Sequence, residues 1–301
     1  MKPFYKVGNL PIVLASSAYY VPYMDITIKS IIDMSTPKNR YDIIVLHKEI
    51  SYEEQKELKR NEKNNVSIRF LKIDETLDQK KFNYRPGYAP ESFYRVVMPY
   101  ILDEYDEAIW LDCDLIIKRD IADLFEEARN SINGRSIAAC KDIDGMASCV
   151  CNHESRKQYM HSVLKLDTIT DYFQSGVMYF NFKKIKEKYS LVDLVEASCN
   201  PLIMYGDQDV LNYLYNDDVY YLNMSWNTIT NGKRMQLETL LLLAPISIVE
   251  QFLRARENPY ILHLATKPWN DPLSEYAEDF WKYARRSIFY NSIIHRWNQH
   301  R

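Results

Sequence analysis

Residues 109–114 of this chain read IWLDCD and place two carboxylates, Asp112 and Asp114, one residue apart after a short apolar run. Carboxylates at this spacing can both reach one hard cation, Mg²⁺ or Mn²⁺, whose other positions phosphate oxygens can fill. The pattern alone is weak, because 142–144 and 207–209 repeat it and a solvated turn has the same composition. Its position directly after a buried strand favours the first pair, since two acids have no structural role there.

A second candidate group consists of His263 and Lys267, which follow the strand-like run Tyr260–Leu262. An imidazole can complete a mixed oxygen and nitrogen site that suits Mn²⁺. A lysine can hold a diphosphate as a point charge. A lone histidine is more often a hydrogen-bonded structural residue, and this alternative remains open.

The elements that must position these residues alternate between strand and helix over the first ~115 residues. Strands are expected at residues 11–15, 41–46, 66–73 and 108–111, and helices at 23–34, 51–61 and 91–102. The helix at 51 opens with a capping box, Ser51 with Glu54. This alternation predicts an α/β fold, with a mostly parallel central sheet and helices on both faces. Ligands of such sheets bind beyond the carboxyl ends of the strands, here after Ala15 and Leu111.

Composition limits the classes of function. The net charge is −3, so the chain has no basic field and nucleic acid is not expected as a partner. The apolar runs Leu10–Ala15 and Leu237–Val249 are too short to span a membrane, and the second is expected to be a buried helix or strand. Five cysteines include a C-x-C at 149–151, which could hold a soft metal, although reduced thiols fit better. We therefore expect a cytoplasmic protein.

Four blocks of residues, in this order and spacing, resemble glycosyltransferase family 8, the retaining family of bacterial lipooligosaccharide galactosyltransferases and glycogenin. They cover roughly residues 10 to 270. The blocks are VLA with YVPY within 13–23, FYR to DCD within 93–114, FQSGVM to DQD within 173–212, and HLATKPW at 263–269.

This resemblance implies a GT-A type, Rossmann-like nucleotide-sugar binding fold over residues 1–270 and a basic, aromatic helical extension over 271–301. It implies a hexosyltransferase that uses Mn²⁺, or Mg²⁺, to transfer glucose or galactose. The donor would be UDP-glucose or UDP-galactose, and the acceptor a saccharide, glycolipid or glycoprotein. The alternative is a catalytically degenerate member that serves as a sugar-nucleotide-binding or scaffold protein.

The resemblance also implies roles for individual residues. The metal would be held by Asp112, Asp114 and His263. The nucleotide and its phosphates would contact Ala15, Ser17, Tyr20, Arg95, Cys113 and Lys267. The donor sugar would bind Asp142, Gln174, Ser175 and Asp207, with Gln208 beneath the anomeric carbon. Packing of Tyr20 and Arg95 on a helix, and helix capping by Asp207 and Asp209, remain as structural alternatives.

Four positions depart from the family pattern. Ser17 stands where the family usually has an aspartate that contacts the base, and Tyr19 where it has an asparagine. Gln174 replaces an asparagine, and Thr266 replaces a glycine in a loop that is two residues shorter. Base recognition and closure of the loop over the diphosphate are therefore expected to differ.

Two further questions remain open at this level. Because an amide is a poor nucleophile, Gln208 favours front-face attack by the acceptor over double displacement through Asp209 or another carboxylate. The segment Leu273–Arg301 is expected to be helical, basic and aromatic. It would either pack on the catalytic domain or make a peripheral contact with the inner face of the membrane through residues 285–301.

Overall fold

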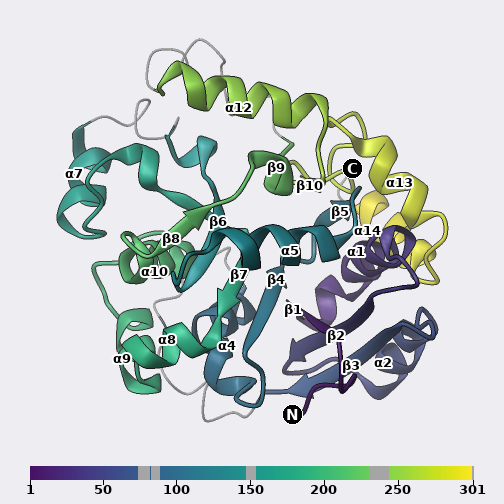
Figure 1. The fold of residues 1–301 in the computed structure, drawn as a ribbon. Helices are drawn as coiled ribbons and strands as arrows, with labels where there is room; N and C mark the ends of the chain where they lie inside the picture. Colours follow the sequence, from purple (N-terminus) through teal and green to yellow (C-terminus); the bar gives the residue numbers. More distant parts are fainter. Residues whose placement is uncertain (74–81, 83–88, 147–153, 231–243, 300–301) are drawn as a thin grey trace.

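A computed structural model describes residues 1–73, 82, 89–146, 154–230 and 244–299 (Figure 1). The C-x-C at 149–151 lies outside the described residues, as do residues 237–243 of the second apolar run. The remainder of that run ends in helix α12 (Ile246–Glu257), in which Ile248 and Val249 are buried.

A seven-stranded sheet forms the centre of the molecule, in the order β3-β2-β1-β4-β7-β6-β8. Its strands are β1 (Asn9–Ala15), β2 (Arg40–His47), β3 (Val66–Lys72), β4 (Glu107–Leu111), β6 (Ile137–Lys141), β7 (Phe173–Asn181) and β8 (Val219–Tyr221). Four of the pairings between neighbouring strands are parallel, and β7 runs antiparallel to both β4 and β6. The predicted mostly parallel sheet is confirmed.

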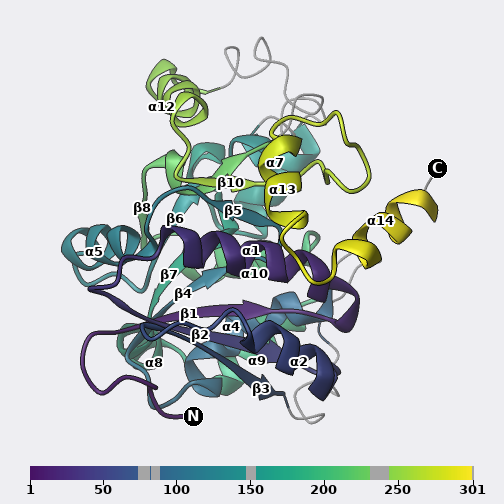
Figure 2. The same cartoon turned by 90° about the vertical axis from the view of Figure 1, so that its right-hand side faces the viewer.

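Helices cover both faces of this sheet, which explains why its inner strands are mostly apolar. Along β1, Ile12 and Leu14 contribute to one buried cluster and Val13 to the other, because successive strand residues point to opposite faces. One face carries α1 (Val21–Met34), α2 (Tyr52–Lys59) and α5 (Ile121–Ser131), and α1 and α2 lie on the near side of the molecule in Figure 2.

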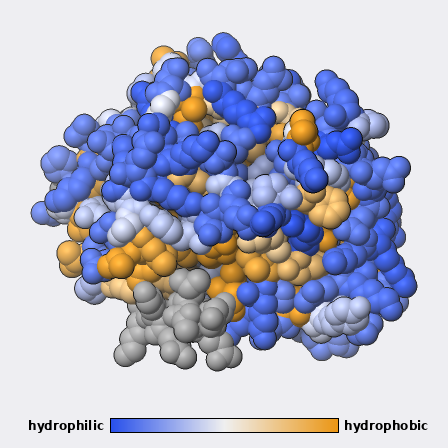
Figure 3. Space-filling view, turned by 60° about the horizontal axis from the view of Figure 1, so that its bottom comes forward, coloured by the Kyte–Doolittle hydropathy of each residue, from blue (hydrophilic) through white to orange (hydrophobic). Residues whose placement is uncertain are grey.

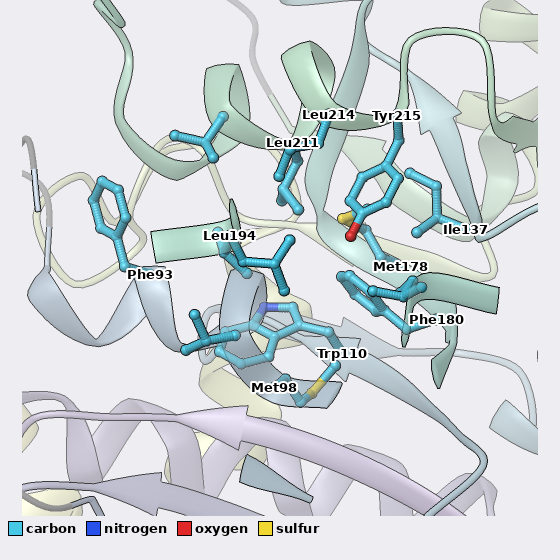
Figure 4. Close-up of a cluster of buried hydrophobic side chains, with 14 of the residues drawn as sticks. Phe93, Met98, Trp110, Ile137, Met178, Phe180, Leu194, Leu211, Leu214 and Tyr215 are labelled. Atoms are coloured by element: carbon cyan, nitrogen blue, oxygen red, sulfur yellow. The ribbon is translucent and has the colours of Figure 1, made fainter. Parts of the chain in front are cut away.

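The opposite face carries α4 (Tyr94–Ile101), α8 (Phe182–Lys188), α9 (Leu191–Ser198) and α10 (Gly206–Tyr215). Figure 4 shows Trp110 of β4 and Met98 of α4 in the same apolar cluster as Leu194 and Leu211. The predicted capping box is present, because Ser51 and Glu54 exchange hydrogen bonds at the start of α2. The helix expected at 91–102 begins as a 3₁₀ turn, Pro90–Phe93.

A second sheet of three short strands lies in the order β5-β10-β9. It consists of β5 (Leu115–Ile117), β9 (Thr228–Ile229) and β10 (Ile261–His263). The antiparallel pairing of β10 with β5 places His263 opposite Leu115, one residue after Asp114. This small sheet thus joins the two groups of candidate metal ligands.

The C-terminal segment, which was expected to be helical, forms two helices, α13 (Ala277–Ala284) and α14 (Tyr290–Gln299). Both pack on α1, and Phe280 and Ile293 share a buried cluster with Tyr23. Arg286 pairs with Asp33 of α1. Across the described ranges, none of the helices is long and apolar enough to cross a bilayer.

The molecular surface is mostly polar on the face shown in Figure 3. Hydrophobic residues gather there in patches between hydrophilic ones.

Candidate functional site

A cavity of about 610 Å³ lies at the carboxyl ends of β1 and β4, where the sequence predicted a ligand site. It is lined by every predicted site residue except Asp209, namely Ala15, Ser17, Tyr20, Arg95, Asp112, Cys113, Asp114, Asp142, Gln174, Ser175, Asp207, Gln208, His263 and Lys267. The antiparallel direction of β7 brings Gln174 and Ser175, near its beginning, to the edge where β4 ends.

Asp112, Asp114 and His263 converge so that one potential ligand atom from each lies within 4.8 Å of the others. Burial raises the pKa of Asp112, an effect that the Arg95 guanidinium opposes. Burial acts in the same direction on Asp114, but the Lys267 ammonium and the His263 ring outweigh it and hold the pKa of Asp114 below its ordinary value. Two neighbouring carboxylates, of which Asp114 is kept ionised by these cations, can bind a metal ion.

Two observations test whether these residues fit a divalent cation. Asp114 Oδ1 is buried and has no hydrogen-bond partner in the described part of the chain, so a lone pair is free for a metal. His263 Nδ1 lies 3.0 Å from Asn227 Oδ1, which can only accept a hydrogen bond. A proton on Nδ1 serves this contact, so a metal at the site would take the lone pair of Nε2, which lies 3.4 Å from Asp114 Oδ1. The donor set fits a hard or borderline divalent ion.

Gly176 makes room for this arrangement. A Cβ atom at this position would lie 2.4 Å from His263 Cε1 and 3.1 Å from Asp112 Oδ2. Only glycine allows the imidazole and the carboxylate to approach β7 this closely. The backbone of Gly176 also fixes the end of β4, because its carbonyl accepts a 2.9 Å hydrogen bond from the Asp112 amide.

Lys267 reaches the same carboxylate from the loop after β10. Its ammonium group donates to Asp114 Oδ2 and, over 2.8 Å, to the carbonyl of Leu264. A lysine this close to the candidate metal ligands can contact the phosphates of a ligand that the metal holds.

Arg95 is buried at the base of the cavity and links two of its carboxylates. Its guanidinium donates to Asp112 Oδ1 over 2.8 Å and pairs with Asp207 Oδ2 at 3.0 Å. It also donates to the carbonyls of Ser92 and Ser175. Arg95 therefore fixes the geometry of the two carboxylates relative to each other.

Gln208 lies between Ser175 and Asp142. Its Oε1 accepts a 3.1 Å hydrogen bond from the Ser175 amide, and its Nε2 donates over 2.8 Å to Asp142 Oδ2. Burial raises the pKa of Asp142 to about 6. Gln174 is 8 % exposed, and its Oε1 is buried without a hydrogen-bond partner among the described residues, which suits an acceptor for a ligand hydroxyl.

Asp209 is the one predicted site residue that the structure does not bring to the cavity. It is fully buried and accepts hydrogen bonds from Tyr159, Tyr172 and the amide of Tyr205. A carboxylate in this position has no open path to a ligand in the cavity.

The opposite end of the cavity is formed by the residues after β1. Ala15, Ser17 and Tyr20 lie there beside Cys113, whose thiol donates to the Ala15 carbonyl over 3.1 Å. Burial raises the pKa of the Cys113 thiol, which stays neutral. The Tyr20 ring meets Trp269 and Tyr23 edge-on.

Several residues of the site were missed by the sequence reasoning. Those that line the cavity include Glu91, Ser92, Trp110, Asp144, Gly145, Arg156, Tyr172, Tyr205, Ile229 and Ala265. Two others contact the candidate metal ligands: Asn227 contacts the His263 ring, and Gly176 leaves room for His263 and Asp112. Proximity to the predicted blocks could have indicated Ser92, Tyr172 and Tyr205, whereas Asn227 and Arg156 carry no such signal.

Comparison with known proteins agrees with the family resemblance of the four sequence blocks. The family model "Glycosyl transferase family 8" matches residues 11–272. The chain is 26 % identical over 279 residues to glycosyltransferase GlyF of Streptococcus pneumoniae serotype 4, covering 90 % of this chain and 60 % of GlyF. It is 24 % identical over 203 residues to the lipopolysaccharide 1,2-glucosyltransferase of Escherichia coli K12, covering 60 % of this chain and 55 % of that protein.

Solved structures share the fold. The apo form of the bifunctional glycosyltransferase WbbM superposes with a TM-score of 0.83 at 23 % identity, over 98 % of this chain and 53 % of WbbM. The galactosyltransferase LgtC, in complex with donor and acceptor sugar analogues, gives a TM-score of 0.70 at 22 % identity, over 93 % of this chain and 96 % of LgtC. The fold is of the GT-A type, and the match of the family model over most of the sequence shows that the chain belongs to glycosyltransferase family 8.

Proposed function

We propose that this protein is a retaining, Mn²⁺-dependent hexosyltransferase that transfers glucose or galactose from a UDP-sugar to a saccharide, glycolipid or glycoprotein acceptor. The observation that carries the proposal is the convergence of Asp112, Asp114 and His263 on the cavity that also holds Lys267 and Gln208. Residues 1–270 would form the catalytic domain, and residues 271–301 a helical extension packed on α1.

Asp112, Asp114 and His263 would hold the cation. When bound, a divalent ion neutralises the charge that develops on a diphosphate leaving group. Lys267, which donates to Asp114, would be able to contact the diphosphate instead, because a bound cation would compensate the charge of that carboxylate.

The hydroxyls of the donor sugar would bind Asp142, Gln174, Ser175 and Asp207, at the end of the cavity away from Tyr20. Tyr20 would contact the base, with Ala15, Ser17 and Cys113 along the nucleoside. The orphaned Oε1 of Gln174 supports this placement, because a buried acceptor needs a donor and a sugar hydroxyl can supply it.

Gln208 would face the anomeric carbon. Its amide oxygen can stabilise positive charge on the sugar but is a poor nucleophile, which favours attack by the acceptor from the face that the leaving group vacates. The burial of Asp209 supports this route over a double displacement through that carboxylate.

The test is turnover of UDP-glucose and UDP-galactose with and without Mn²⁺, and with GDP- and ADP-sugars for comparison. Asp112→Asn and Asp114→Asn should abolish metal-dependent release of UDP, because a neutral amide is a weaker ligand for a hard cation. Asp123→Asn, which loses only a surface pair with Arg119, is the matched control. Binding of a UDP-sugar without turnover by the wild type would instead indicate a sugar-nucleotide-binding protein.

We further propose that the protein works in the cytoplasm, and that any contact with the inner face of the membrane is confined to residues 285–301. Arg286 and Arg296 are engaged with Asp33 and with the Tyr19 carbonyl, whereas Arg285 is exposed. Flotation with anionic vesicles at low and high salt tests this contact.

A further inference from the structure

A group of buried polar side chains that includes none of the candidate metal ligands lies next to Gln208. Asp209 is its centre, and each of its carboxylate oxygens accepts a 2.6 Å hydrogen bond from a tyrosine, Oδ1 from Tyr172 and Oδ2 from Tyr159. Arg156 pairs with the same carboxylate at 3.6 Å. The negative charge of the Asp209 carboxylate is thus compensated by these three partners, and the carboxylate does not line the cavity.

Tyr172 connects this group to the site. Its hydroxyl has one proton, and an ionised carboxylate can only accept, so the proton is directed at Asp209. The hydroxyl oxygen then presents only lone pairs to Gln208, whose Nε2 donates to it over 3.1 Å. Burial raises the pKa of Tyr172 well above its ordinary value, so the hydroxyl remains protonated at every working pH.

The other partners of Gln208 impose the same orientation on its amide. Asp142 Oδ2 accepts from Nε2 at 2.8 Å, and the backbone N–H of Ser175, which can only donate, faces Oε1 at 3.1 Å. An amide turned by 180° would place its oxygen against two acceptors and its NH₂ group against a donor. Each misplaced contact would leave a buried polar group unsatisfied.

We propose that Tyr172, held by Asp209, is a positioning residue that fixes the Gln208 amide with its oxygen turned toward Ser175 and the donor sugar. The inference rests on the proposed function, because it matters only if Gln208 faces a reacting anomeric carbon. It assigns Asp209 to orientation of the site and not to nucleophilic attack.

Tyr159 provides a matched control. It makes the same hydrogen bond to Asp209, with the same length, but its oxygen accepts from the backbone amide of Met204 and not from Gln208. Tyr159 does not line the cavity. Removing either hydroxyl therefore removes one donor to Asp209, and only Tyr172→Phe also removes an acceptor from the Gln208 amide.

The experiment compares Tyr172→Phe with Tyr159→Phe in the full chain, using UDP release with Mn²⁺ and the donor that the wild type turns over. Tyr172→Phe should lower kcat about tenfold, with a change of less than about threefold in the KM of the donor. Tyr159→Phe should keep kcat within about threefold of wild type. Combined with Gln208→Ala, Tyr172→Phe should cause no further loss, because its effect passes through that amide.

Equal losses of kcat in the two tyrosine variants would overturn the inference, since a role in supporting Asp209 alone predicts them. A wild type that turns over no sugar nucleotide would instead overturn the proposed function. If Tyr172→Phe does not fold, Asp209→Asn tests the same relay. The amide that this substitution introduces can donate to the Tyr172 hydroxyl. The hydroxyl proton is then free to turn toward Gln208 Nε2, where the hydroxyl no longer acts as an acceptor, and kcat should again fall about tenfold. Unchanged kcat in Asp209→Asn would overturn the inference.

Discussion

The indole N–H of Trp110 donates a 2.9 Å hydrogen bond to Oδ1 of Asp112, two residues further along the chain. The same oxygen accepts from Arg95, whose guanidinium lies 4.6 Å from the centre of the Trp110 ring. Oδ1 is thereby held by protein groups, and Oδ2 is left to face His263 and the candidate metal position. A residue of the main apolar cluster thus orients a candidate metal ligand.

Replacing this indole should weaken metal binding. In Trp110→Phe the Asp112 carboxylate loses one of its two orienting donors, and we expect the apparent Mn²⁺ affinity to fall about tenfold. Thermal unfolding measured across a Mn²⁺ titration reports the affinity. Trp226→Phe is the control, because that indole is equally buried and donates to Glu127, which does not line the cavity. Equal Mn²⁺ affinities in the two variants would contradict the prediction.

Adding a methyl group at Gly176 should have a larger effect. The Cβ of Gly176→Ala would collide with the His263 ring, so the ring must move away from Asp112 and Asp114. We expect Mn²⁺ to bind at least about tenfold more weakly, as measured by calorimetry. Gly134→Ala should lower stability by about 1 kcal/mol through its positive φ of 78° but leave the Mn²⁺ titration unchanged.

The pH dependence of turnover should carry the signature of Asp142. Its pKa of about 6 means that the carboxylate gains a proton between pH 7 and 5, and one of its oxygens then becomes a donor, so that it no longer accepts fully from Gln208 and the backbone amides at the same time. At saturating Mn²⁺, kcat should fall as the pH drops through about 6. Asp142→Asn mimics the protonated form, and its kcat should be about tenfold lower and flat across this range.

The free energy of unfolding should also depend on the protonation of Asp142, but it should rise, where kcat falls, as the pH drops. The folded-state pKa of about 6 lies above the value of about 3.9 expected for an unfolded chain, so the folded protein binds this proton more tightly. The stabilisation that Asp142 contributes is complete below pH 3.9 and is lost as the pH rises through 6. Denaturant titrations of wild type and Asp142→Asn should therefore differ more at pH 7.5 than at pH 4.5. No pH dependence of that difference would contradict the prediction.

The C-terminal helix should influence the nucleoside end of the cavity. The Arg296 guanidinium lies 4.2 Å from the centre of the Tyr19 ring and donates to the Tyr19 carbonyl, next to Tyr20. Arg296→Ala should weaken UDP binding about three- to tenfold, as measured by calorimetry, because the turn that presents Tyr20 loses its anchor. Arg285→Ala, which removes an exposed arginine, should leave UDP affinity unchanged.

The first half of the fold is readable from the sequence because its strands are short apolar runs and its helices are amphipathic. Residues 11–15 and 41–46 lie inside β1 and β2, and the capping box at Ser51 marks the start of α2. The second half is less regular. β7 carries the polar residues Gln174 and Ser175 directly after Phe173, because that end of the strand faces the cavity, and this hides the strand from an analysis of apolar periodicity.

The candidate site could be predicted where its residues directly follow an apolar strand or belong to one of the four family blocks, as Asp112 and His263 do. Residues that act through another side chain were not. Asn227, which contacts the His263 ring, belongs to a 3₁₀ turn far along the chain, and only the second sheet brings it near. Asp209 shows the reverse, since a carboxylate in the right block proved to lie behind the cavity wall.

The place of β7 in the sheet has a consequence for synthesis on the ribosome. β4 pairs with β1 on one side and β7 on the other, but β7 begins at Phe173, 62 residues after Leu111 ends β4. At about 5–20 residues per second, β4 waits about 3–12 s for its second neighbour. During this interval the emerging chain carries an apolar strand with an open hydrogen-bonding edge. The nascent N-terminal half is therefore a stage at which this protein is exposed to intermolecular strand pairing.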